Sequence, residues 1–103
     1  MRAKVKTIDL QAKEWFDKVN GNSYFSCEVT VNFGLKSEFS FYIPMTYGYG
    51  SHYQDVAFNE LKSRINQKIF REAEKMCSLS RFCDENGIVL RSNKQENCLK
   101  RDL

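Results

Sequence analysis

Hydrophobic and polar positions alternate in two stretches of the first half of the chain, and this pattern predicts two neighbouring β-strands. The first, residues 23–32, has on its apolar face Phe25, Cys27, Val29 and Val31. The second, residues 38–43, has on its apolar face Phe39, Phe41 and Ile43. Tyr24 and Tyr42 fall on the opposite, polar faces. Pro44 has no N–H group to donate, so we expect it to end regular pairing.

The segment before these strands has two interpretations. Residues 5–10 contain Val, Thr and Ile and predict a first strand. Residues 12–19 could form two helical turns stopped by Gly21, or could continue the strand into a hairpin. The hairpin is favoured because Asn20-Gly21 is the preferred pair for a two-residue type I′ turn, in which both residues have positive φ.

A helix is predicted after the second strand. Ser51 and Gln54 match the capping box, in which the first residue caps the helix and the fourth reaches back. The apolar stripe that follows consists of Val56, Phe58, Leu61, Ile65, Ile69, Ala73 and Met76. We expect one long helix or a broken pair of helices as far as about Asn86, where Gly87 is a stop signal.

The predicted fold is a single α+β domain covering residues 1–103. The apolar run at residues 88–90 is expected to return to the sheet as a last strand, giving the order β-β-β-α-(α)-β. This order predicts an antiparallel sheet of about three to four strands, with one face covered by one long or two shorter helices.

Composition and charge exclude several classes of protein. The net charge is only +3, weaker than the imbalance typical of a dedicated nucleic-acid binder and opposite to that of an acidic DNA mimic. No apolar run approaches the roughly 20 residues of a membrane span, and the basic residues 1–6 lack the apolar segment of a secretory signal. We therefore expect no membrane partner, a cytoplasmic location and reduced cysteines.

The sequence offers little for metal binding or catalysis. The cysteines (Cys27, Cys77, Cys83 and Cys98) show no pair at the spacing of roughly two to four residues usual in zinc sites. His52 is the only histidine, and no signature of an activated nucleophile surrounds any serine or cysteine. Glu14 and Asp17 flank the Trp15-Phe16 pair, but acids near a turn are usually solvated. We expect no metal, no cofactor and no enzymatic activity.

The segment Tyr47-Gly48-Tyr49-Gly50 is the most unusual in composition. Its glycines and the following helix start could hold an anion, but the segment lacks the Lys-Ser/Thr of a P-loop, so the glycines are interpreted as turn residues. The tyrosines could fold over the sheet edge as core or could contact a partner. The basic helix positions are Lys62, Arg64, Lys68, Arg71 and Lys75, and they form either a solvated face or an electrostatic footprint.

Three stretches of the chain resemble small uncharacterised accessory proteins of tailed bacteriophages. They are residues 12–25 (AKEWFDKVNGNSYF), the loop that begins at Pro44 and ends at Gly50, and residues 96–101 (ENCLKR). The resemblance carries no catalytic motif. It implies expression in the cytoplasm of an infected bacterium and a role in blocking host defence or redirecting host machinery.

The leading hypothesis is a non-enzymatic protein that binds and inhibits or redirects a host protein, such as a restriction, exclusion or CRISPR factor. The candidate contact residues are Trp15, Phe16, Tyr47, Tyr49, His52, Tyr53, Arg64, Lys68 and Arg71. In the alternative, a nucleic-acid-binding module, Tyr24 and Tyr42 stack on bases and the basic helix face contacts phosphates. An edge strand beside the loop could pair in a homodimer, so both a monomer and a homodimer remain open.

Overall fold

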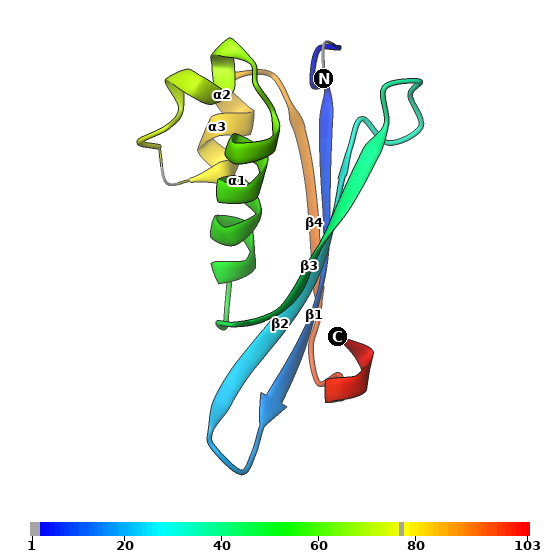
Figure 1. The fold of residues 1–103 in the computed structure, drawn as a ribbon, viewed down its shortest axis with the longest axis vertical. Helices are drawn as coiled ribbons and strands as arrows, with labels where there is room; N and C mark the ends of the chain where they lie inside the picture. Colours follow the sequence, from blue (N-terminus) through cyan, green and yellow to red (C-terminus); the bar gives the residue numbers. More distant parts are fainter. Residues whose placement is uncertain (1–2, 77) are drawn as a thin grey trace.

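The computed structural model describes residues 3–76 and 78–103 and has the predicted α+β architecture, a four-stranded sheet with helices on one face (Figure 1). The elements in chain order are β1 (Thr7–Asp17), β2 (Asn22–Val31), β3 (Phe39–Tyr47), α1 (His52–Arg64), α2 (Lys68–Glu72), α3 (Leu79–Glu85), β4 (Val89–Gln95) and the 3-10 helix η1 (Lys100–Asp102). The order of strands across the sheet is β3-β2-β1-β4.

The sheet is mixed rather than wholly antiparallel. β1, β2 and β3 form the predicted antiparallel meander, whereas β4 pairs with β1 in parallel. A parallel pairing needs a crossover connection, and the helical segment between β3 and β4 supplies it. The predicted inward positions of β2 are confirmed, because Phe25, Cys27, Val29 and Val31 are all buried.

Residues 12–17 belong to a continuous strand, which confirms the hairpin, but the expected two-residue turn is wrong. β1 ends at Asp17 and β2 begins at Asn22, and of the turn residues only Gly21 has positive φ, at 69°. The Gly21 N–H donates to the Asp17 carbonyl at 2.7 Å. The Asp17 carboxylate accepts from the Val19 N–H at 3.0 Å and from the Asn20 side chain at 2.8 Å, and these bonds hold the wider loop.

Pro44 does not end β3 but interrupts its register. Cys27 lies opposite Ile43, whereas Phe25, two residues earlier in β2, lies opposite Thr46. β3 therefore contains one residue more than β2 over this interval, which is a β-bulge. Pairing resumes beyond it and continues to Tyr47 opposite Tyr24.

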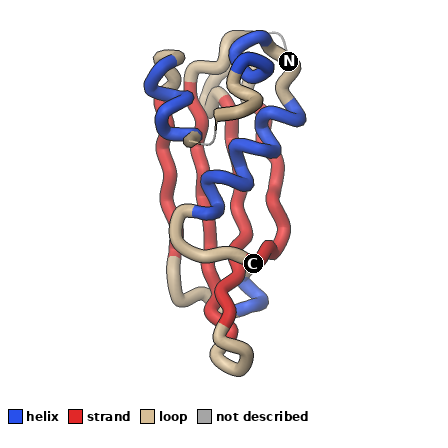
Figure 2. The backbone as a smooth tube through the Cα atoms, turned by 90° about the vertical axis from the view of Figure 1, so that its left-hand side faces the viewer, coloured by secondary structure: helices blue, strands red, loops and turns tan. Residues whose placement is uncertain are grey.

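The helical layer has three short helices where the sequence predicted one or two. The buried side of α1 consists of Tyr53, Ala57, Phe58 and Leu61. After α1 the chain turns at the buried Ile65, and Phe70 of α2 then packs against Phe82 of α3 with ring centroids 4.9 Å apart. Seen from the helical side, the helices cover one part of the sheet, and the β1–β2 hairpin extends beyond them (Figure 2).

The start of α1 is not stabilised by the predicted capping box. Ser51 has φ −92° and ψ 9°, and its side chain makes no capping hydrogen bond. An N-cap hydroxyl is usually positioned by extended backbone, which Ser51 does not have. The Gln54 amide instead donates to the hydroxyl oxygens of Tyr53 and Ser92, each at 3.2 Å, and so links α1 to β4. At the other end of the layer, the predicted stop is confirmed, since α3 ends at Glu85 and Gly87 has φ 65°.

Three of the cysteines are free and buried: Cys27, Cys83 and Cys98. Cys77, which the sequence also predicts to be a reduced thiol, lies outside the described residues. Burial raises the pKa of the Cys27 and Cys83 thiols from 9.0 to about 11. Both thiols are therefore protonated in the folded protein at neutral pH.

We expect the free energy of unfolding to fall as pH rises from about 9 to about 11. Below this range the thiols are protonated in both states, and within it they ionise only in the unfolded chain, which then gains stability. At pH 10 the loss is about 1 kcal/mol for each thiol. Urea unfolding across pH 7 to 10 measures it, and a Cys83→Ala variant should show a shallower decline. An identical pH slope in this variant would contradict the assignment.

Among the helices that the structure describes, none combines the length and the apolar composition that crossing a bilayer would require.

Candidate functional site

One face of the sheet carries no α-helix. Figures 1 and 2 show α1, α2 and α3 on one side of the strands and η1 on the other side, near the base of the β1–β2 hairpin. The face that the three helices leave uncovered is here called the open face. Its residues in β1 and β2 are those that alternate with the buried positions, and they include Trp15 and Tyr24.

Three aromatic side chains lie side by side across the open face, one from each strand of the meander. Trp15 is opposite Tyr24 in the register, and Tyr24 is opposite Tyr47. The rings of Trp15 and Tyr24 stack with centroids 5.5 Å apart and planes at 25°. Those of Tyr24 and Tyr47 meet edge to face at 5.8 Å and 81°. We call Trp15, Tyr24 and Tyr47 the aromatic ladder.

The bulge in β3 is what brings Tyr47 into this ladder. Phe39, Phe41 and Ile43 pack towards the helices, so strict alternation would direct Tyr47 to the same side. The extra residue at Pro44 and Met45 inverts the alternation, so that Thr46 pairs with Phe25 and Tyr47 pairs with Tyr24. A tyrosine that would have joined the core side is thereby exposed on the open face.

The ladder is accessible to solvent, and side chains of both charge signs lie near it. The Tyr47 side chain is 58% exposed, whereas Trp15 and Tyr24 are partly buried by their neighbours. The Lys100 ammonium of η1 lies 5.6 Å from the centre of the Trp15 ring, within the range of a cation–π contact. The adjoining hollow on the open face, about 220 Å³, has among its lining residues Lys13, Glu28 and Asp102.

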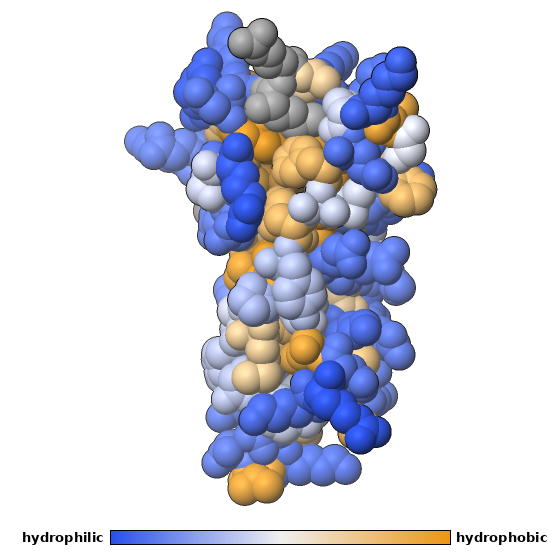
Figure 3. Space-filling view, turned by 45° about the vertical axis from the view of Figure 1, so that its right-hand side comes forward, coloured by the Kyte–Doolittle hydropathy of each residue, from blue (hydrophilic) through white to orange (hydrophobic). Residues whose placement is uncertain are grey.

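The space-filling view shows how apolar and polar side chains are distributed on one side of the molecule (Figure 3). Orange and pale side chains run along the middle of this side, and blue side chains lie at its margins. The exposed Phe, Tyr and Trp residues of the described chain are Phe16, Phe33, Tyr42, Tyr47 and Tyr49. The last three lie in β3 or in the loop that follows it, as does the exposed Met45.

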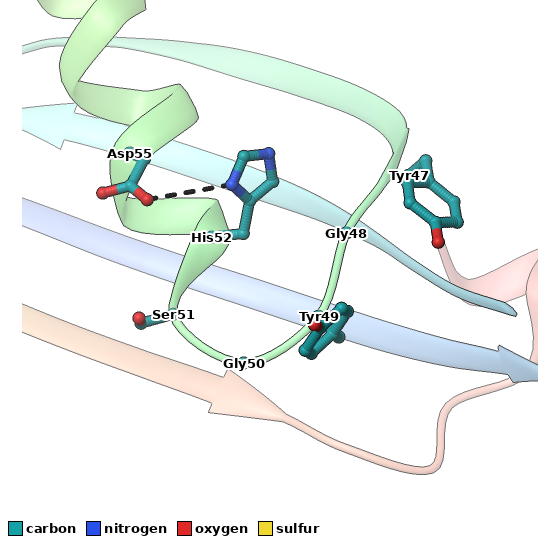
Figure 4. A pocket seen from close by; sticks show the side chains of 7 residues that line it. All are labelled: Tyr47, Gly48, Tyr49, Gly50, Ser51, His52 and Asp55. Atoms are coloured by element: carbon teal, nitrogen blue, oxygen red, sulfur yellow. Dashed lines mark ion pairs between the residues drawn. The ribbon is translucent and has the colours of Figure 1, made fainter.

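The loop between β3 and α1 forms a second feature beside the ladder. Its pocket, of about 530 Å³, is lined by Tyr47, Gly48, Tyr49, Gly50, Ser51, His52 and Asp55 (Figure 4). Figure 4 shows the side chains of the two tyrosines on the loop side and those of His52 and Asp55 on the first turn of α1. His52 Nδ1 and Asp55 Oδ2 are 3.7 Å apart, and both side chains are half exposed, so this pair contributes little to stability.

Gly48 is required by close packing. A Cβ atom at this position would lie 2.6 Å from Cδ2 of His52 and 2.9 Å from Cε1 of the buried Phe25. The His52 ring itself packs edge to face on the Phe25 ring at 6.1 Å. Gly50 has φ 63°, a conformation that favours glycine. These two glycines have the turn role that the sequence suggested.

A lysine of β4 anchors the loop. Lys94 donates from Nζ to the Gly50 carbonyl at 3.0 Å and pairs with the Glu14 carboxylate at 3.3 Å. The Lys94 and Glu14 side chains are only 14% and 15% exposed, the lowest values among the ion pairs of the described residues. Glu14, which the sequence suggested as a weak acid candidate, is therefore the counter-ion of a structural lysine. A second carboxylate, that of Glu96, lies 3.6 Å from the same ammonium.

The structure brings together some predicted contact residues and separates others. Trp15 and Tyr47 share the ladder, and Tyr49 and His52 line the adjacent pocket. Phe16 is exposed, but strand alternation directs it away from the face that carries Trp15. The prediction for Tyr53 was wrong, because its side chain is buried against the core with 6% exposure. As the second residue of α1, it belongs to the side of the helix that is buried.

The predicted basic contact residues lie away from the ladder and are engaged locally. Arg64 closes α1, some 18 Å along the helix from its first residue, and pairs with Glu60 at 3.1 Å. Lys68 pairs with Glu72 at 3.6 Å, and Arg71 donates to the Asn66 side chain at 2.7 Å. None of the three belongs to the aromatic ladder or lines the loop pocket.

Two contributors to the surface were not among the predicted contact residues for a protein partner. Tyr24 was expected to point outward and was assigned a role only in the nucleic-acid alternative, yet it is the central ring of the ladder. Lys100 lies in the C-terminal segment, for which the sequence contains no periodic signal, and only the folded chain brings it to Trp15. The alternation that directs Tyr24 outward could have identified it, whereas nothing in the sequence identifies Lys100.

Within residues 3–76 and 78–103, no group of three or more His, Cys, Asp or Glu residues is arranged to hold a metal ion. No protein-family model, curated protein or solved structure matches this chain.

Proposed function

We propose that this protein acts by binding another protein through the aromatic ladder of its open face, without catalysing a reaction. The observation that carries the proposal is the row Trp15–Tyr24–Tyr47, three mutually packed rings on a sheet face that no α-helix covers. Tyr and Trp supply large contact area with few rotatable bonds, and they are the residues most enriched at the energetic centres of interfaces. Mutual packing also fixes the rings before a partner arrives, which lowers the entropy cost of binding.

The charges favour a protein partner over a nucleic acid. A phosphate backbone requires several cations that are free to replace counter-ions. On the described helices, Arg64, Lys68 and Arg81 are each paired with a glutamate one turn away. Around the ladder the charges are mixed, as expected for the polar rim of a protein interface.

The arrangement of reactive groups supports the non-catalytic part of the proposal. His52 is half exposed and pairs with a half-exposed carboxylate, that of Asp55, at 3.7 Å. The Cys27 and Cys83 thiols are buried, and burial holds their pKa at about 11, far above that of an activated nucleophile.

The resemblance to phage accessory proteins gives the proposal its biological setting. It directs the search to a protein of an infected bacterial cytoplasm, with restriction, exclusion and CRISPR factors as the first candidates. In this setting the chain would act stoichiometrically, by covering a site or by blocking an assembly step.

We expect Tyr47→Ala to weaken binding of the partner at least tenfold, the usual effect of truncating an aromatic anchor. Tyr49→Ala is the matched control, because Tyr49 is the same residue type, is 73% exposed and lies outside the ladder. We expect its effect to be less than about threefold. The measurement is capture of host lysate proteins on the tagged chain with nuclease and moderate salt, followed by titration with the purified partner.

The outcomes separate the alternatives. A stoichiometric protein that Tyr47→Ala loses and Tyr49→Ala retains supports the proposal. Equal losses of partner binding in both variants would indicate that the partner contacts the loop pocket rather than the ladder. Captured material that nuclease removes, with binding that weakens steeply as salt rises, would instead support the nucleic-acid alternative.

A further inference from the structure

β3 forms one edge of the sheet and is hydrogen-bonded on one side only, to β2. Its sequence, FSFYIPMTY, contains no charged residue. Monomeric proteins usually protect exposed edge strands with charged side chains, because unpaired N–H and C=O groups otherwise recruit another strand. We propose that two copies of this chain pair antiparallel through their β3 edges, about a two-fold axis at Phe41.

The opposite edge carries the charged side chains that β3 lacks, whereas in β3 only Pro44 and the bulge, which lie beyond the segment from Phe39 to Ile43, hinder edge pairing. β4 carries Arg91 and Lys94 within its seven residues. Arg91 forms a bidentate pair with Asp9, with nitrogen–oxygen distances of 2.6 and 3.0 Å. Lys94 points to the helical side, and an inward-pointing charge is a known device against edge pairing. The contrast between the two edges indicates which one is available to a second copy.

The register of the proposed dimer follows from Pro44 and from symmetry. Pro44 cannot donate a hydrogen bond, and the bulge distorts the edge there, so pairing is confined to the segment from Phe39 to Ile43. A two-fold axis at its central residue, Phe41, places Phe39 opposite Ile43 of the second copy. Ser40 then lies opposite Tyr42 of the second copy on the open face.

In this register, the apolar side chains of one β3 strand lie beside the apolar side chains of the other. Phe39 and Phe41 stack with centroids 6.4 Å apart, face the helical layer and are only partly buried. A second copy would extend the core over these rings. The Arg64 guanidinium lies 4.2 Å from the centre of the Phe41 ring and pairs with Glu60, so two such ion pairs would flank the axis and could exchange partners. No like charges on β3 oppose the contact.

The inference is independent of the proposed function. Pairing through residues 39–43 occupies the β3 edge and leaves the aromatic ladder on the open face of each copy. The test therefore needs only the purified chain and no partner, and its result leaves the Tyr47→Ala comparison unaffected.

The test is sedimentation velocity of the 12.1 kDa chain at about 5 to 200 µM, the range in which a small interface is expected to dissociate. The wild-type chain should shift from monomer to dimer as concentration rises. Ser40→Lys/Tyr42→Lys places lysines opposite lysines and should weaken the dimer at least tenfold. Circular dichroism and thermal melting check that this variant is folded.

Two further samples make the test specific. Mixing Ser40→Lys/Tyr42→Lys with Ser40→Glu/Tyr42→Glu places opposite charges across the axis and should restore a dimer. Asn93→Lys, on the β4 edge, should dimerise as the wild type does. A wild-type chain that stays monomeric throughout the range would overturn the proposal. A dimer that Asn93→Lys weakens and the β3 variant does not would also overturn it.

Discussion

Replacing Asn32 by alanine is expected to lower the free energy of unfolding by about 5 kcal/mol. Asn32 follows the last residue of β2, and its side chain is fully buried. Its Oδ1 accepts from the backbone N–H groups of Lys6 and Thr7 at 2.7 and 3.3 Å. Its Nδ2 donates to the Lys4 carbonyl at 3.0 Å and to the Ser37 hydroxyl at 2.9 Å.

The size of this effect comes from two sources. Alanine removes all four side-chain hydrogen bonds and leaves the Lys6 N–H and the Lys4 carbonyl without a side-chain partner, at about 1 kcal/mol for each bond. Asn32 also has φ 56°, a left-handed conformation that costs alanine about 1 kcal/mol more than asparagine or glycine. Together these contacts hold the segment before β1 against the turn after β2.

Urea unfolding followed by the fluorescence of Trp15 measures the effect. Asn32→Gly loses the same hydrogen bonds without the backbone strain, so its loss should be smaller than that of alanine by about 1 kcal/mol. Asn97→Ala isolates the strain alone, because Asn97 has φ 59° and is exposed. If Asn32→Ala costs no more than Asn97→Ala, the hydrogen bonds of the amide do not stabilise the fold.

The strands were predictable from sequence because alternation is a direct consequence of one buried face. It identified the buried positions of β2 and the inward Phe39, Phe41 and Ile43. The return of the chain to the sheet after Gly87 was indicated by the apolar run at residues 88–90 instead. Local signals were less reliable. The capping-box pattern failed because the Gln54 amide bonds to Ser92, a partner that the fold alone brings near.

The break of the helical segment was not predictable in its position. No glycine or proline lies between Leu61 and Phe70, yet α1 ends at Arg64 and the chain is extended at Ile65, with φ −104° and ψ 110°. The reason is tertiary. Turning there lets Ile65 stay buried while Phe70 reaches Phe82, a gain that a continuous helix pointing past the sheet would not provide.

The candidate site was only half predictable, for a related reason. Sequence composition drew attention to Trp15 and to the tyrosines around Gly48. The side on which Tyr47 emerges depends on one extra residue in β3, and Pro44 signalled an irregularity there but not its direction. A bulge changes alternation for every residue beyond it, so the ladder could be recognised only from the register.

The anchoring of the loop beside the ladder leads to the second large effect. Lys94→Met is expected to lower the free energy of unfolding by about 3 kcal/mol, because it leaves the largely buried Glu14 carboxylate without its lysine. Methionine keeps the apolar stem, so little packing is lost. Urea unfolding of the variant at neutral pH measures the loss.

The double variant Lys94→Met/Glu14→Gln separates the two roles of Lys94. Removing both charges should restore about 2 kcal/mol, since a buried pair replaced as a whole costs far less than a pair that is broken. The Gly50 carbonyl still lacks the hydrogen bond from Lys94 in this variant, so a deficit of about 1 kcal/mol should remain. Glu14→Gln alone keeps the ammonium beside Gly50 and Glu96 and should cost less than Lys94→Met. A double variant no more stable than Lys94→Met would show that the lysine stabilises the fold through the loop carbonyl rather than through Glu14. In that case the position of the loop that follows Tyr47 and carries Tyr49 would depend mainly on the hydrogen bond from Lys94 of β4 to the Gly50 carbonyl.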